Sequence, residues 1–148
     1  MSATTSPLPL TRATDESLAA YGALALRVSM GLLFIAHGGI KLFVFTPAGT
    51  AGYFASLGLP AVLAYLTIAV EIIGGAMLVA GIYSRLVSLA VVPVMLGALF
   101  LGHAGNGFLF SAKGGGWEYP AFWTVTLFVQ ALIGDGAAAL KPWSPRSR

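Results

Sequence analysis

The chain has 148 residues, of which 57% are hydrophobic and 9% are charged, with eight Lys or Arg against five Asp or Glu. This composition excludes an ordinary soluble domain, in which about a quarter of the residues are charged, and the scattered basic residues form no stripe that would bind nucleic acid. The chain has no cysteine, which excludes thiolate-bound metal clusters and covalently attached haem. Lipid is therefore the expected solvent, and redox chemistry would need a bound or partner-held cofactor.

Four apolar stretches approach the length of about twenty residues that a helix needs to cross a bilayer. They cover residues 18–43, 60–80, 86–101 and 120–140. The sequence therefore predicts an all-α membrane protein whose membrane domain, residues 18–140, is a bundle of four transmembrane helices. Residues 1–17 are polar and rich in Pro and Thr, so they predict a disordered tail, and residues 141–148 predict a basic tail.

The loop between the first two stretches predicts a short helix of its own. Thr46 can cap its start, Pro47 suits its first turn, and Tyr53, Phe54 and Leu57 follow at helical spacing. We expect this helix to lie on the membrane surface in the first outer loop, because it is short and carries aromatic residues.

Basic residues near the predicted helix ends orient the bundle. One side of the membrane holds five of them and the other side holds two, Lys41 and Lys113. The five are Arg12, Arg85, Lys141, Arg146 and Arg148. Because cytoplasmic loops carry the excess of Lys and Arg, the sequence predicts a multi-pass protein of the cell (inner) membrane with both termini in the cytoplasm.

The ionisable residues Arg27, Glu71 and Asp135 fall within the predicted spans. Such residues are costly in lipid, so they usually pair with each other or line a cavity. Arg27 and Glu71 have similar predicted depths, which predicts an ion pair, and Asp135 and Gln130 would complete a buried polar network. Two interpretations stay open: the network only fixes helix packing, or it handles protons or substrate.

A second polar cluster is expected near the outer surface. His37 and Lys41 are four residues apart and share a helix face, and the last outer loop brings Trp117 and Glu118 to the same level. These four residues could border a headgroup-sized ligand site, or they could form an aromatic belt with a lysine reaching the interface. The pair His37 and His103 gives little support to haem, and no residue group predicts a metal site.

Several segments together resemble the DoxX family of small four-helix membrane proteins. They are LRVSMGLLFIAHGGIKLF, AVEIIGGAMLVAGIYSR, GGGWEYP and LIGDGAAAL, within a resemblance that covers about residues 24–140. The matching positions are Arg27, Gly31, His37, Gly38, Lys41, Glu71, Gly74, Gly75, Gly81, Trp117, Glu118, Gln130 and Gly134.

The resemblance implies a membrane component of a redox system, since some DoxX relatives are membrane subunits of thiosulfate:quinone oxidoreductases and others are partners in oxidative-stress complexes. The leading hypothesis is a membrane subunit that interacts with a quinone bordered by His37, Lys41, Trp117 and Glu118, and with a partner oxidoreductase that supplies electrons. Two other functions stay open. One is a non-catalytic anchor or assembly protein whose small-residue faces pack on another protein or on a second copy, and the other is a small-solute transporter.

The division of basic residues makes the topology testable. A reporter fused after Arg148 or inserted at Ser84 should be cytoplasmic, and a reporter inserted near Gly114 should be external, because the positive charges divide five to two. Reporter activity on each side of the membrane measures this, and an external C-terminus would overturn the predicted orientation.

Overall fold

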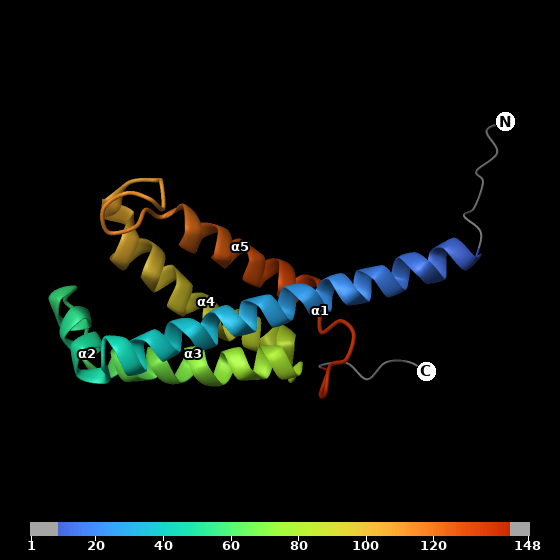
Figure 1. Cartoon of the computed structure of the whole chain (residues 1–148), viewed down its shortest axis with the longest axis horizontal. Coiled ribbons are helices and arrows are strands. Elements are labelled where there is room, and N and C mark those ends of the chain that lie inside the picture. The colour runs from blue at the N-terminus through green and yellow to red at the C-terminus, as the bar shows by residue number, and fades with distance from the viewer. Residues whose placement is uncertain (1–8, 143–148) are drawn as a thin grey trace.

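The computed structural model describes residues 9–142, and every regular element in that range is a helix (Figure 1). The long helices are α1 (Pro9–Gly39), α3 (Val62–Ala80), α4 (Ser84–Gly97) and α5 (Glu118–Ile133). Shorter elements are the π-helix η1 (Ile40–Val44), the helix α2 (Pro47–Ser56), the π-helix η2 (Ala98–His103) and the 3₁₀ turn η3 (Ala104–Asn106). The all-α prediction is therefore confirmed.

Within residues 9–142, three helical stretches are long and apolar enough to cross a membrane, which makes the chain a multi-pass membrane protein. They are Ala13–Val44, Val62–Ala80 and Ser84–Asn106. The helix α5 has 16 residues and rises about 24 Å at 1.5 Å per residue, which is less than the roughly 30 Å of a hydrocarbon core.

The predicted span over residues 120–140 is wrong at its C-terminal end. The helix α5 ends at Ile133 because Gly134 has a φ of 91°, a backbone conformation that glycine adopts without steric cost. Asp135 therefore lies beyond the helix and not inside a span. Its Oδ1 accepts a hydrogen bond of 2.9 Å from the backbone N–H of Ser84, so Asp135 caps the start of α4 from a distant part of the chain.

The structure describes part of each predicted tail. The disordered tail over residues 1–17 is wrong from Pro9 onward, where α1 begins, because proline suits a first turn and each residue added to an existing helix gains a backbone hydrogen bond. In the predicted basic tail, Lys141 pairs with the turn between α3 and α4. Its N–H donates to the Gly81 carbonyl at 3.0 Å and its carbonyl accepts from the Tyr83 N–H at 2.8 Å. Residues 1–8 and 143–148 lie outside the described residues.

The short helix predicted in the first loop is confirmed as α2. Thr46 is its N-cap, with Oγ1 accepting a hydrogen bond of 3.1 Å from the Gly49 N–H, and Pro47 occupies the first turn. Thr46 has a φ of 62°, so the chain turns sharply before α2 begins.

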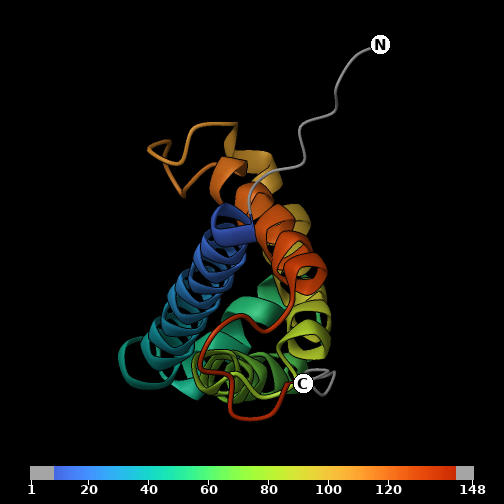
Figure 2. The same cartoon turned by 90° about the vertical axis from the view of Figure 1, so that its right-hand side faces the viewer.

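The long helices form two pairs, α1 with α3 and α4 with α5, which converge at one end of the molecule and diverge toward the other (Figures 1 and 2). We call the converging end, with the α3–α4 turn and residues 134–142, the closed end. The other, with α2 and residues 107–117, is the open end. A buried apolar cluster joins the two pairs between these ends and includes Met30, Phe34, Leu78, Val91, Trp123 and Leu127.

Two arginines hold the closed end together by capping helices other than their own. Arg27 of α1 is fully buried and donates to the carbonyls of Leu78 and Val79, both at 2.7 Å, and of Ala137 at 3.0 Å. Arg85 of α4 donates to two carbonyls in the last turn of α5, at 2.8 Å each. Carbonyls in a last helical turn lack partners within the helix, so these cations stabilise the ends of α3 and α5.

Glycines bring the backbones of α1 and α3 into contact. A Cβ atom on Gly31 would lie 2.6 Å from the Gly75 carbonyl oxygen, and a Cβ atom on Gly75 would lie 2.7 Å from the Gly31 carbonyl oxygen. Gly38, seven residues after Gly31 and on the same face, would place a Cβ atom 2.7 Å from Ile72 Cγ1. Side chains at Gly31 and Gly75 would force the helices apart.

This contact predicts different effects for two adjacent glycines, a loss of stability at Gly75 and little change at Gly74. Gly75→Ala should destabilise the protein by about 1–3 kcal/mol, because the added methyl group meets backbone atoms of α1 that cannot move aside. Gly74→Ala is the matched control, since a Cβ atom there meets its nearest neighbour, Val87 Cγ1, at 3.7 Å, an ordinary contact. Thermal unfolding in detergent measures both variants. Equal stability of the two variants would show that α1 and α3 are not in backbone contact.

Candidate functional site

A cavity of about 1010 Å³ lies between the diverging helix pairs, toward the open end. Its walls come from α1 and η1, α2, α3, α4 and η2, and α5, and most of the lining side chains are apolar. The polar and charged lining residues are His37, Lys41, Thr50, Tyr53, Thr67, Glu71, His103 and Tyr119. A mostly apolar cavity with a few converging polar groups is typical of a small-molecule site.

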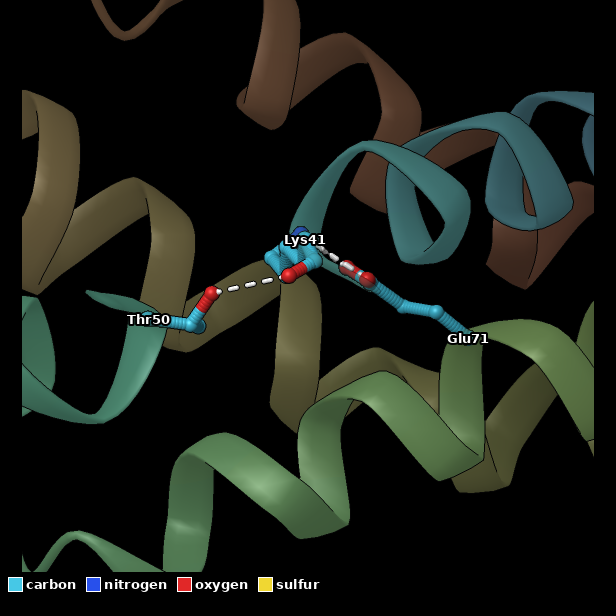
Figure 3. A network of polar contacts seen from close by, with 3 residues as sticks. All are labelled: Lys41, Thr50 and Glu71. Carbon is cyan, nitrogen blue, oxygen red and sulfur yellow. Dashed lines mark hydrogen bonds and ion pairs between the residues drawn. The ribbon is translucent and has the colours of Figure 1, made fainter. Parts of the chain in front are cut away.

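An ion pair lies in the cavity wall (Figure 3). Lys41 Nζ is 2.8 Å from both carboxylate oxygens of Glu71, and the exposed fractions of the two side chains are 21% and 5%. The close approach of the helices at Gly38 allows this pairing, because a Cβ atom at Gly38 would lie 3.2 Å from Glu71 Cβ. Pairing of this kind is what makes charges tolerable at membrane depth.

The segment that carries Lys41 is a π-helix and is tied to α2. The Phe45 N–H donates to the Ile40 carbonyl at 3.0 Å, five residues earlier, a pattern that is rare and frequent at functional sites. Thr50, which is 4% exposed, shares its hydroxyl hydrogen between two carbonyls, that of Thr46 at 2.9 Å and that of Lys41 at 3.3 Å (Figure 3). The contact of Thr50 with the Lys41 carbonyl ties α2 to η1, and α2 forms one wall of the cavity.

The second π-helix, η2, forms the opposite wall and holds the loop over residues 107–117. His103 Nδ1 lies 2.8 Å from the Gly115 carbonyl oxygen, and Asn106 Nδ2 donates to the Gly114 carbonyl at 2.9 Å. These contacts fix the loop at the open end, and they engage one of the two ring nitrogens of His103.

Aromatic rings from α1 and α5 pack together at one wall of the cavity. The ring of Trp123 lies 4.7 Å from Phe34, 5.0 Å from His37 and 5.4 Å from Tyr119, measured between centroids. Trp123 is 4% exposed, and its Nε1 has no hydrogen-bond partner among residues 9–142. The aromatic wall therefore offers flat apolar surfaces beside the ion pair.

Of the four residues predicted to border a ligand, the structure brings two into the cavity. His37 and Lys41 line it, whereas Trp117 and Glu118 do not. Glu118 Oε1 accepts a hydrogen bond of 2.6 Å from the Phe110 N–H, and the Trp117 ring packs on Phe108 at 4.9 Å. Both residues are engaged in organising the loop.

Thr50, Tyr119 and Trp123 also line the cavity and were not among the four residues predicted to border the ligand. Tyr119 and Trp123 are four residues apart in α5 and so share a face. That spacing was visible in the sequence, but it does not show which of the aromatic residues in this region face inward.

The predicted pair of Arg27 with Glu71 is wrong. The helices α1 and α3 run antiparallel with Gly31 opposite Gly75, which places Lys41 beside Glu71 and Arg27 beside the end of α3. Arg27 interacts electrostatically with Asp135 instead. The depths of the Cα atoms could not reveal this, because side chains on a helix lean toward its N-terminus, so Lys41 near the C-terminal end of its span reaches back toward the membrane centre.

The other predicted members of the polar network lie near the closed end. Gln130 is fully buried, but its Nε2 donates to the Gly134 carbonyl at 2.6 Å, just beyond its own helix. The predicted network is therefore divided between the cavity, with Glu71, and the closed end, with Arg27, Gln130 and Asp135.

Among residues 9–142 no group of three or more His, Asp or Glu side chains is arranged to hold a metal ion.

Comparison with known proteins identifies the family. Residues 22–104 match the model of the DoxX family. The chain belongs to the DoxX family. A relative from Bacillus subtilis (strain 168), named "Putative oxidoreductase CatD", is 32% identical over 130 residues, which cover 82% of this chain and 86% of the relative. No solved structure matches the chain. The family match includes Lys41 and Glu71 and ends before α5.

The ion pair makes a prediction for stability. Lys41→Met and Glu71→Gln should each lower the free energy of unfolding by about 3 kcal/mol, because each change leaves the partner's charge alone in the cavity wall. The double variant should recover part of this loss. Arg27→Met combined with Glu71→Gln is the matched control and should show additive losses, since these residues do not touch. Thermal unfolding in detergent measures all the variants, and additive losses for Lys41 and Glu71 would contradict the pairing.

Proposed function

We propose that this protein is the membrane subunit of a quinone-linked redox system, in which the cavity binds the quinone and a partner oxidoreductase exchanges electrons with it. One observation carries the proposal: the cavity combines an ammonium–carboxylate pair with a wall of aromatic rings. The oxidoreductase name of the Bacillus subtilis relative supports a redox function for this member of the family.

The lining residues fit a quinone headgroup. A quinone is a flat apolar ring with two carbonyl oxygens that accept hydrogen bonds. The Lys41 ammonium has three hydrogens, and among residues 9–142 its acceptors are the two oxygens of Glu71, so one N–H remains for a ligand oxygen. The rings of His37, Tyr119 and Trp123 lie on the same cavity wall and suit contact with a flat ring.

The ion pair also suits proton handling. A quinone takes up two protons and two electrons when it is reduced to a hydroquinone. Lys41 and Glu71 share a hydrogen bond and both line the cavity, so we assign to them the donation and uptake of protons at the ligand oxygen. Thr67 lies one turn from Glu71 on the same wall and can accept or donate a hydrogen bond there.

We also propose that α5 is a fourth membrane span and that the closed end faces the cytoplasm. Large apolar side chains of α5, including Phe122, Val125, Phe128 and Leu132, are exposed, as expected for a helix in lipid. The basic residues Arg85 and Lys141 lie at the closed end, which agrees with the rule that basic residues face the cytoplasm. The open end, with α2 and the aromatic loop, would then lie at the outer surface of the cell (inner) membrane.

The proposal predicts that quinones quench the fluorescence of Trp123. We would replace Trp117 and Trp143 by Phe, so that the cavity tryptophan is the remaining fluorophore, and titrate lipid nanodiscs with a para-benzoquinone and a naphthoquinone. We expect saturable quenching. The double variant Lys41→Met with Glu71→Gln should weaken binding at least about tenfold, because a charge-assisted hydrogen bond to the ligand is lost.

One outcome would contradict the proposal. Quenching that rises linearly with quinone, as in nanodiscs where quinone only dissolves in lipid, would show that the cavity is no quinone site. In that case stable co-purification with a partner would support an anchor or assembly function, and solute flux into proteoliposomes would support a transporter.

A further inference from the structure

Two rows of apolar side chains face each other across the cavity. The row on α3 is Leu63, Leu66 and Val70, and the row on α4 and η2 is Val94, Ala98 and Leu101. Each row follows helical spacing, so its members lie on one face of their helix. The cavity therefore has an extended apolar part in addition to the ion pair and the aromatic wall.

The charged and apolar parts are separated along α3. Glu71 directly follows Val70, and Leu63 lies eight residues before Glu71, which is about 12 Å along the helix axis. Lys41 lies beside Glu71, so both charges of the pair are at one end of the α3 row. Among the α3 residues that line the cavity before Glu71, Thr67 is polar and Leu63, Leu66 and Val70 are apolar. A ligand with a polar end at the ion pair and a longer, mainly apolar end therefore complements the cavity.

The size of the cavity agrees with this division. A volume of about 1010 Å³ lies at the upper limit for drug-sized ligands, whose sites span roughly 300–1,000 Å³. A one-ring or two-ring headgroup without substituents would occupy the space beside Lys41 and Trp123 and leave the two rows uncovered. Leu66 is 54% exposed, and the α3 and α4 helices diverge here (Figure 1), so an apolar chain between them can continue into lipid.

We infer that the ligand of this cavity is a lipid-soluble molecule with a long apolar tail, bound with its headgroup at Lys41 and Glu71 and its tail between the α3 and α4–η2 rows. This inference rests on the proposed quinone function and specifies the class of quinone. Ala98 and Leu66 are then specificity-determining residues that contact the tail, and they do not contact the headgroup.

Narrowing the tail channel tests the inference. Ala98→Phe adds bulk to one row, and Leu66→Phe changes the facing row. The matched control is Ala76→Phe, because Ala76 is an exposed residue of α3 that lines no part of the cavity. Each variant is made in the full chain with Trp117 and Trp143 replaced by Phe, placed in nanodiscs, and titrated with the same quinone ring with and without a decyl tail.

We expect Ala98→Phe to weaken binding of the tailed quinone about tenfold, and to change binding of the tail-less quinone by less than about twofold. Leu66→Phe should act in the same direction, and Ala76→Phe should change neither affinity. The thermal unfolding temperature of each variant shows whether it is folded. If one variant does not fold, the variant in the other row tests the inference.

The failure of the inference is distinct from the failure of the proposed function. If the parent protein binds both quinones but Ala98→Phe and Leu66→Phe weaken both equally, or weaken neither, the tail assignment is overturned and quinone binding stands. If the parent protein binds neither quinone, the proposed function and this inference fail together.

Discussion

The contact between α1 and α3 is the constraint on which the rest of the structure depends. Gly31 and Gly75 let the two backbones touch, and this contact fixes the antiparallel register of the helices. The register decides that Lys41 meets Glu71 in the cavity and that Arg27 meets the last turn of α3. A shift of one helical turn, about 5.4 Å, would break both contacts and leave charges without partners in lipid.

The two ends of the molecule have different roles: the closed end holds the helices together, and the open end encloses the cavity. At the closed end, Arg27 and Arg85 bind carbonyls of neighbouring helices, and residues 134–142 return to α1 and the α3–α4 turn. These polar bonds hold the helices in a medium where apolar contact alone gives little preference for protein over lipid. Because the closed end is fastened in this way, the helix pairs can diverge at the open end and enclose the cavity.

Departures from regular helix geometry are concentrated around the cavity. Both π-helices, η1 and η2, contribute to its walls, and Pro93 lies within the cavity wall on α4. A π turn or a proline frees backbone groups that need other partners, and Thr50 supplies one of these by donating to the Lys41 carbonyl. The cavity is thus built from the least regular parts of the long helices, as is common for ligand sites.

The sequence by itself determined the all-α membrane character, the α2 helix with its Thr46 cap, the family, and the place of His37 and Lys41 at a polar site, because hydropathy, capping and helical spacing are local properties of the chain. Only the tertiary structure decided that Glu71 pairs with Lys41, that Asp135 leaves its helix to cap α4, and that Trp123 lines the cavity in place of Trp117. These outcomes depend on helix register and on the direction of long side chains, which are set by backbone contacts such as that of Gly31 with Gly75 between segments far apart in the chain.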